Sequence, residues 1–296
     1  MTKCKVSVAI ATYNGEKYLR EQINSILSQS YKPDEIIVSD DNSNDNTVQI
    51  LKEYQDEGLL KYYINPQRGI VENFKNAVSN CKKDNYIALS DQDDIWLPEK
   101  NEYCVNELRK INPEIPALVF SDLVVIDANG KQINQSFFKE IVEANPEFEK
   151  LQSLLYSNKV IGCTTVFNQA MRKYFDQMPA NISMHDYWIA LISFTFGRHV
   201  YIKKPLINYR RHFNNVTRTH DNVIYKIFNE LTDYLLNRNI LLDKQIESVI
   251  LFEQLYRDKF DPDTHKCIAD FINLKHKPTI IKRMKTFKYK SSKAVK

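Results

Sequence analysis

The sequence predicts an α/β protein with a mostly parallel sheet and flanking helices, and two observations support this prediction. From residue 6 to residue 90, short apolar runs rich in β-branched residues alternate with segments whose apolar positions recur at helical spacing. Such alternation is typical of βαβ units, whose strands run parallel. Polar residues also follow each apolar run, and ligands of parallel sheets bind beyond the carboxyl ends of the strands. We therefore look for function at that edge.

Three strand–helix units are expected before residue 81. The strands are predicted at Val6–Ala11, Glu35–Val38 and Leu60–Ile64, each followed by a helix, over about 16–29, 45–57 and 70–80. The polar segments after these strands are Thr12-Tyr13-Asn14-Gly15, Ser39-Asp40-Asp41-Asn42-Ser43 and Asn65-Pro66-Gln67-Arg68-Gly69. The chain has no Gly-x-Gly-x-x-Gly after the first strand and no Walker loop, which argues against dinucleotide and P-loop chemistry.

The next apolar run, Tyr86–Leu89, is predicted to be a buried strand that ends in Ser90-Asp91-Gln92-Asp93-Asp94-Ile95-Trp96-Leu97-Pro98. Three carboxylates within four residues repel one another unless a cation lies among them, and oxygen ligands of this kind suit Mg²⁺ or Mn²⁺. An acidic turn in solvent, capping a helix that opens at Pro98, would explain the same residues. The polar clusters at the same edge of the sheet favour the metal site.

The second half of the chain alternates less regularly. Strands are predicted at Ala117–Ile126 and His199–Asn208, a hairpin turn at Asp127–Gly130 and a helix opening at Met184–Trp188. Residues 131–158 show no clear period and are expected to form a mobile segment on the acceptor side. Two amphipathic helices, Asn222–Arg238 and Ile240–Arg257, are expected to pack on the sheet domain, form a dimer face or present the tail. The predicted divisions are 1–219, 220–274 and 275–296.

Composition and charge give the cellular setting. The five cysteines have no Cys-x-x-Cys pair, which indicates reduced thiols without a disulfide framework or a zinc site. No signal peptide or membrane-length apolar run is apparent, so a cytoplasmic protein is expected. Lys275–Lys296 holds nine Lys or Arg and no acid, so the net charge of +4 divides into +9 for this tail and −5 for the rest. That balance argues against nucleic-acid binding by the body. Ile280, Ile281, Met284 and Phe287 recur at helical spacing, which suits either the inner surface of an anionic membrane or a disordered solubilising tail.

Several motifs together resemble family-2 glycosyltransferases of the GT-A fold, nearest to the bacterial rhamnosyltransferase-like branch that builds surface polysaccharides. They are Val8-Ala9-Ile10-Ala11-Thr12-Tyr13-Asn14-Gly15, Asp40-Asp41-Asn42-Ser43 and the acidic stretch extended to Glu99-Lys100, within a resemblance over roughly residues 5–215. The resemblance implies a nucleotide-sugar donor, dTDP-rhamnose or a UDP-hexose, and Mg²⁺ or Mn²⁺. It also implies inversion at the anomeric carbon and a saccharide or lipid-linked acceptor.

The resemblance also implies roles for single residues. Asp41, with Asp40 beside it, would contact the base, Asp91 would lie near the ribose, and Asp93 would bind the metal. Gly162 would lie under the sugar, and Asp186 would be the catalytic base. His212 would complete the metal or diphosphate site, and Arg210 and Arg211 would bind the diphosphate through forked hydrogen bonds. Thr12, Tyr13 and Arg68 complete the candidate donor-binding set.

Three alternatives stay open from the sequence. Asp186 could simply be a helix N-cap, since Asp is a preferred capping residue. A sugar nucleotidyltransferase would also use carboxylates and a metal on an α/β sheet, but it would be expected to carry a glycine-rich basic loop after the first strand. A non-catalytic scaffold subunit would bind the nucleotide-sugar without turning it over.

Overall fold

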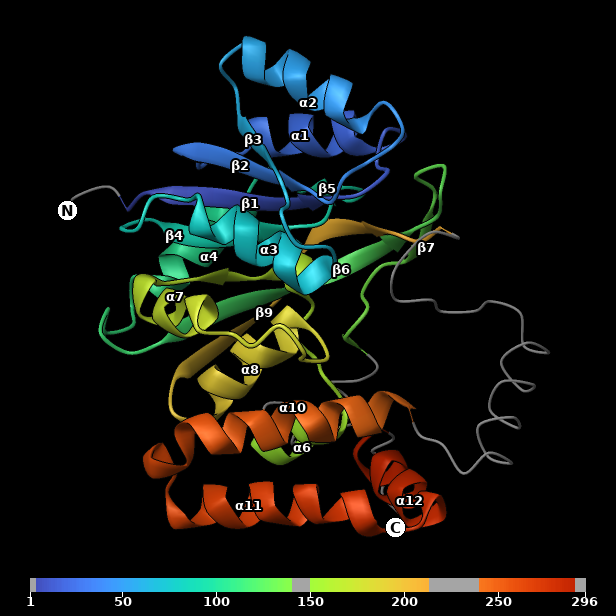
Figure 1. Ribbon diagram of the computed structural model, residues 1–296. Helices are drawn as coiled ribbons and strands as arrows, with labels where there is room; N and C mark the ends of the chain where they lie inside the picture. The colour runs from blue at the N-terminus through green and yellow to red at the C-terminus, as the bar shows by residue number, and fades with distance from the viewer. Residues whose placement is uncertain (1–3, 140–149, 213–239, 291–296) are drawn as a thin grey trace. The chain divides into compact units, whose positions relative to one another are not determined.

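The computed structural model describes residues 4–139, 150–212 and 240–290 (Figure 1). The chain divides into two compact units. The first comprises residues 1–138, 160–180 and 184–210, and the second comprises 139–159, 181–183 and 211–296. Residues 139–159 group with the C-terminal helices, and the predicted boundaries at 219 and 274 stay predictions.

Within the described residues, the first unit is built on one nine-stranded mixed sheet of order β3-β2-β1-β4-β8-β6-β9-β5, with β7 paired to β6. The strands are β1 (Val6–Thr12), β2 (Glu35–Asp40), β3 (Lys61–Ile64), β4 (Tyr86–Ser90), β5 (Ile95–Trp96), β6 (Ala117–Ile126), β7 (Gln132–Asn134), β8 (Val166–Phe167) and β9 (Arg198–Arg210). β1 to β4 are parallel, as predicted, and so is the β6–β9 pair, whereas β5, β7 and β8 run antiparallel to their neighbours.

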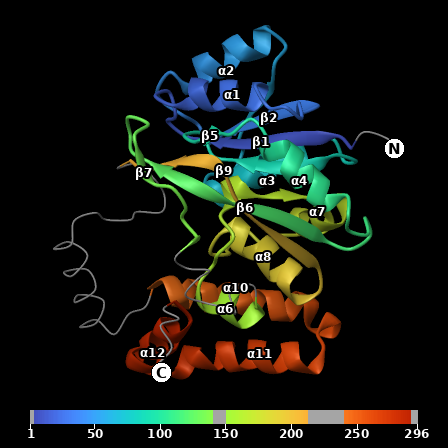
Figure 2. The same cartoon turned by 180° about the vertical axis from the view of Figure 1, so that it is seen from behind.

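Helices cover both faces of this sheet (Figures 1 and 2). Side chains alternate between the faces along a strand, and Val8 and Ile10 share a buried cluster with Leu19 and Val105 on the face of α1 and α4. On the other face α3 packs on β1 and β2, and α7 lies between α3 and α8. The helices are α1 (Leu19–Leu27), α2 (Thr47–Asp56), α3 (Ile70–Ser79), α4 (Lys100–Leu108), α7 (Gln169–Asp176) and α8 (His185–Thr195), with a 3₁₀ turn η1 (Gly162–Thr164) before β8.

The register of the parallel strands brings the polar segments to one edge. Thr12 pairs with Asp40, Asp40 pairs with Ile64, and Ile10 pairs with Ser90. The residues that follow β1, β2, β3 and β4 therefore leave the sheet at the same side, as the parallel arrangement predicted.

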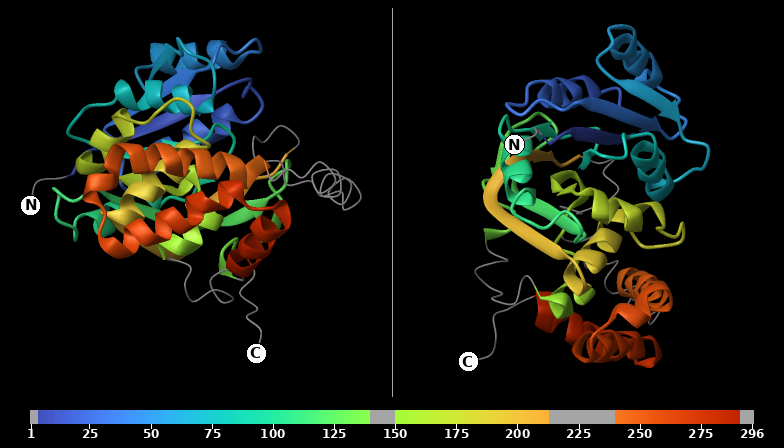
Figure 3. Two further views of the ribbon diagram at one scale, coloured as in Figure 1. Left: turned by 60° about the horizontal axis from the view of Figure 1, so that its bottom comes forward. Right: turned by 90° about the vertical axis from the view of Figure 1, so that its left-hand side faces the viewer.

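The second unit is helical and has its own apolar core. Its helices are α6 (Leu151–Tyr156), α10 (Ile240–Tyr256), α11 (Pro262–Ile272) and α12 (Thr279–Lys290), with 3₁₀ turns η2 (Arg257–Lys259) and η3 (Asn273–His276) (Figure 3). The rings of Tyr156 and Phe271 meet edge to face with centroids 5.1 Å apart. Along the parts of the chain that the structure describes, no helix is long and apolar enough to cross a bilayer.

The structure corrects three predictions about local elements. The segment 131–158, predicted to lack regular structure, contains β7 and α6 in its described parts. Pro98 does not open a helix, because it lies in a turn and α4 begins at Lys100. α11 was missed, although Asp261 caps it by accepting a hydrogen bond from the Thr264 N–H and proline follows as the first residue. The predicted helix 240–257 is α10, and the one at 222–238 lies outside the described residues.

Candidate active site

The ends of β1 and β2 are joined through Asp40. Its carboxylate accepts hydrogen bonds from Thr12 Oγ1 (2.9 Å), the Ser43 N–H (2.8 Å) and Ser43 Oγ (2.6 Å), and the side chain is fully buried. Buried carboxylates need such partners. Asp40 therefore holds the loop after β2 in place beside Asp41, and its predicted contact with the base stays a prediction.

Asp41 is bound to the loop that follows β3. Its carboxylate accepts hydrogen bonds from Asn65 Nδ2 (2.9 Å) and the Gly69 N–H (3.0 Å). Gly69 has φ +111°, a conformation that side-chain-bearing residues rarely adopt, so glycine is required there. Arg68, next to it, is exposed. The structure thus brings the predicted residues Asp41 and Arg68 onto neighbouring loops at the same edge of the sheet.

Gln92 links the acidic segment after β4 to the end of β1 through hydrogen bonds. Its side-chain oxygen accepts the Tyr13 N–H (2.8 Å), and its Nε2 donates to the Tyr13 carbonyl (2.9 Å). A Cβ atom at Gly15 would lie 2.2 Å from that Gln92 oxygen, so only glycine lets the two loops approach. Gln92 was not predicted as a site residue, and its position between two aspartates gave no sign of this backbone pairing.

Three groups able to ligate a metal converge behind this pairing. Carboxylate oxygens of Asp91 and Asp94 and the thiol of Cys163 lie within 4.8 Å of one another. Asp94 is fully buried, and although its Oδ1 accepts the Arg210 N–H (3.0 Å), no described residue donates a hydrogen bond to its Oδ2. Burial and the neighbouring Asp93 raise the pKa of Asp94 well above its usual value.

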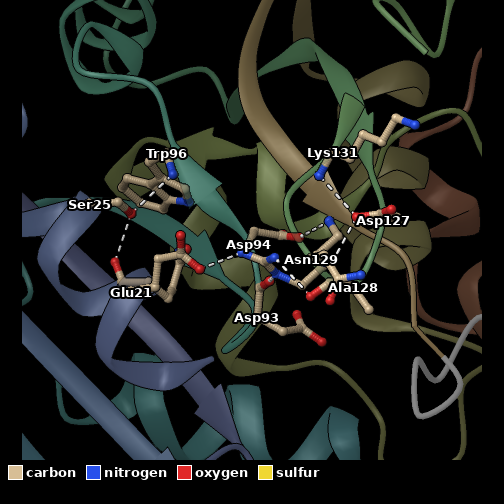
Figure 4. Close-up of polar contacts among 11 residues, drawn as sticks. Glu21, Ser25, Asp93, Asp94, Trp96, Asp127, Ala128, Asn129 and Lys131 are labelled. Atoms are coloured by element: carbon tan, nitrogen blue, oxygen red, sulfur yellow. Dashed lines mark hydrogen bonds and ion pairs between the residues drawn. The ribbon is translucent and has the colours of Figure 1, made fainter. Parts of the chain in front are cut away.

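The cluster is short of positive charge. Burial, Asp93 and then Asp186 raise the pKa of Asp91 to about 7. Negative groups crowded in this way bind a cation favourably, and the carboxylate oxygens fit Mg²⁺ or Mn²⁺. The buried oxygen of Asp94 without a donor supports the same fit. Asp93, the predicted ligand, is outside the converging trio, and its side chain points away from that of Asp94 (Figure 4).

A buried lysine lies on the inner side of the cluster. Lys100 is fully buried, and its ammonium is 3.7 Å from the ring centroid of Trp96. Burial lowers the pKa of Lys100, and the charges of Cys104, Cys163 and Asp94 oppose that shift. Lys100 stands inside the acidic stretch quoted above and Cys163 lies far from it in the sequence, and neither residue was assigned to the site from the sequence.

Arg210 fixes the acidic segment from the last strand. Its side chain is buried, Nε donates to the Asp93 carbonyl (3.0 Å), and one Nη donates to a carboxylate oxygen of Glu21 (Figure 4). The other Nη is 3.4 Å from the Ala128 carbonyl. In this arrangement the guanidinium positions the acidic segment, and the diphosphate-binding role of Arg210 stays a prediction.

Asp186 stands at the start of α8 and faces the segment before β8. The helix begins at His185 and no side chain caps it, so Asp186 is not an N-cap. One carboxylate oxygen of Asp186 accepts the Gly162 N–H at 3.1 Å. His185 is buried against Phe74, with ring centroids 4.0 Å apart, and a Cβ at Gly162 would come within 2.7 Å of its Nε2. Gly162 is thus required for close packing against His185 and Asp186.

The site residues come together in one unit, with two exceptions. Asp186 binds the Gly162 N–H, and Cys163, the next residue, converges with Asp91 and Asp94; the charge of Asp186 also raises the pKa of Asp91. Arg211 and His212 belong to the second unit, so their part in the site remains a prediction.

The sequence matches known proteins along most of its length. The profile of "Glycosyl transferase family 2" matches residues 7–178. "dTDP-rhamnosyl transferase RfbG" of Shigella flexneri is 30% identical over 224 residues, which cover 70% of this chain and 72% of that protein. Two solved structures share the fold. TarS 1–349 of S. aureus in complex with UDP-GlcNAc has a TM-score of 0.55 and 19% identity over 96% of this chain and 89% of that one. The mannosyltransferase PcManGT of Pyrobaculum calidifontis, solved with GDP-Man and Mn²⁺, has a TM-score of 0.59 and 14% identity over 97% and 74%.

Proposed function

The chain belongs to glycosyltransferase family 2 and has a GT-A fold, and from that premise we propose that it is an inverting, metal-dependent transferase. It would move a sugar from a nucleotide-diphosphate donor to a hydroxyl of a saccharide or lipid-linked acceptor. One observation carries this proposal: Asp186 accepts the N–H of Gly162, and the next residue along the chain, Cys163, converges with Asp91 and Asp94. In a glycosyltransferase, the residues that bind the donor diphosphate must lie close to the base that activates the acceptor.

The chemistry follows from the positions of these residues. The acceptor oxygen attacks the anomeric carbon of the donor, the bond from that carbon to the diphosphate breaks, and Asp186 takes the acceptor's proton. Asp91 and Asp94 would hold Mg²⁺ or Mn²⁺, which when bound supplies positive charge to the leaving diphosphate, and Asp93 is proposed to reach the ion from outside that pair. Arg210 holds the acidic segment through its N–H to Asp94 Oδ1 and its Nε to the Asp93 carbonyl, and Lys100 lies buried over the Trp96 ring.

The donor-binding edge is proposed to lie along Thr12, Tyr13, Asp41 and Arg68. Tyr13 is exposed beside Gln92, and Arg68 is exposed beside the loop that binds Asp41. An exposed aromatic ring and an exposed guanidinium suit a nucleoside base and a phosphate, respectively. RfbG, by its name, is a dTDP-rhamnosyl transferase, and the acidic motif points the same way, so dTDP-rhamnose is the first donor to test and the UDP-hexoses are the next.

A donor panel tests the proposal. The melting temperature of the protein is measured with dTDP-rhamnose, UDP-hexoses and GDP-mannose, each with Mn²⁺ or with EDTA. The cognate donor should raise it with Mn²⁺ and much less with EDTA, because a ligand at one hundred times its Kd stabilises the folded state by about 2.7 kcal/mol. A panel without any metal-dependent shift would contradict the proposed donor class. Nucleoside monophosphates, which lack the diphosphate, are the matched ligand control.

A further inference from the structure

Helix α12 faces outward with its apolar side. Met284 is 69% exposed, Ile280 55% and Ile281 37%. Thr279 and Lys282, by contrast, are buried. Residues 279 and 282 fall on one side of a helix, and residues 280, 281 and 284 on the other. The helix therefore buries polar side chains and exposes apolar ones, the reverse of what packing on an apolar core predicts.

An ion pair fixes this orientation. The ammonium of Lys282 is 2.7 Å from a carboxylate oxygen of Asp243 on α10, and the lysine side chain is almost fully buried. α12 also packs against α6 within the same unit. Turning the apolar side inward would break this pair. The exposure of Ile280, Ile281 and Met284 thus follows from the orientation in which the Lys282–Asp243 ion pair holds the helix.

The charge around the apolar side indicates what covers it. Lys277 and Lys285 are exposed next to it, and Lys275–Lys296 holds nine Lys or Arg and no acid. Apolar side chains bordered by cations are typical of helices that lie in the interface of anionic membranes. A second copy of the chain fits less well, because a symmetric contact through this side would bring lysines against lysines.

We propose that α12 is a docking element for anionic lipid surfaces, with Ile280, Ile281 and Met284 entering the interface and Lys277 and Lys285 contacting the headgroups. Thr279–Lys290 form a helix, whereas the alternative interpretation of the sequence was a disordered tail. The proposal does not depend on the reaction that the first unit catalyses.

Vesicle sedimentation of the full chain tests the apolar part. Wild type should sediment with phosphatidylcholine–phosphatidylglycerol vesicles and not with phosphatidylcholine alone. The triple variant Ile280→Gln, Ile281→Gln, Met284→Gln should partition at least about tenfold less, because its apolar surface is gone. Leu255→Gln, on α10 and 53% exposed, is the matched control and should partition like wild type. Equal partitioning of wild type and the triple variant would overturn the proposal.

A charge variant and a fluorescent reporter give independent readouts. Lys277→Glu with Lys285→Glu should lower binding at least about tenfold at low salt, while Lys244→Glu with Lys266→Glu should not. Met284→Trp should show a blue-shifted emission with anionic vesicles, against a constant background from Trp96 and Trp188, which are buried.

Three further outcomes would overturn the proposal. Light scattering that shows a wild-type dimer and a monomeric triple variant would assign this side to a second copy. Wild type that fails to bind anionic vesicles, or an unshifted Met284→Trp emission with vesicles bound, would remove lipid as the partner.

Discussion

Asp186→Asn should lower the turnover of glycosyl transfer by about 100-fold or more while leaving donor binding close to wild type. Asparagine keeps an oxygen that can accept the Gly162 N–H, so the segment before β8 stays in place. It cannot take a proton from the acceptor, and general base catalysis commonly contributes factors of this size. The measurement is release of nucleoside diphosphate with saturating donor and Mn²⁺, with donor Kd measured in parallel.

The control for Asp186→Asn is Asp84→Asn, since Asp84 is exposed in the same unit and has no proposed role. It should match wild type in both turnover and Kd. Near-wild-type turnover of Asp186→Asn would remove Asp186 from the mechanism. A large fall in donor affinity or melting temperature would instead give it a structural role.

Asp93→Ala should remove the metal-dependent part of donor binding. Wild type should bind the donor more tightly with Mn²⁺ than with EDTA. The variant should bind the donor equally in both conditions, and its affinity should be at least about tenfold weaker than that of wild type with Mn²⁺. A tenfold loss of affinity corresponds to about 1.4 kcal/mol. This is a modest value for one carboxylate that contacts a metal ion bound to the donor diphosphate. Calorimetry of the donor with Mn²⁺ and with EDTA gives both affinities.

The metal-free protein separates this loss from unfolding. Asp93 raises the pKa of Asp91 and of Asp94, so removing its charge should relieve repulsion and leave the free energy of unfolding the same or higher. Asp93→Asn, which keeps an oxygen but not the charge, should retain part of the Mn²⁺ dependence. A variant that binds donor like wild type in Mn²⁺ would take Asp93 out of the metal site.

Local signals in the sequence were enough to predict much of the fold. Apolar periodicity located β1 to β4 with their intervening helices, since β1, β2 and β4 are continuous buried runs and the helices are amphipathic. The shared edge followed from the parallel arrangement. The short β5 and β7 and the six-residue α6 escaped prediction because segments of this length show no period.

The site was predictable to the extent that it lies in contiguous motifs. The acidic segment was identified, but the partners that arrange it were not. Arg210 reaches Asp93 across 117 positions, and Cys163 joins Asp91 and Asp94 only through the folding of β8 beside β4. Such contacts depend on tertiary structure and cannot be predicted from residue type and spacing.

Nucleoside diphosphate release by wild type tests the central claim most directly. The protein is incubated with the donor that the thermal panel selects, with saccharide and lipid-linked acceptors, and with Mn²⁺ or EDTA. We predict release that requires donor, acceptor and Mn²⁺ together. Metal-dependent donor binding with no release for any acceptor would contradict catalysis and favour a scaffold, and formation of nucleoside triphosphate from donor and pyrophosphate would favour a nucleotidyltransferase.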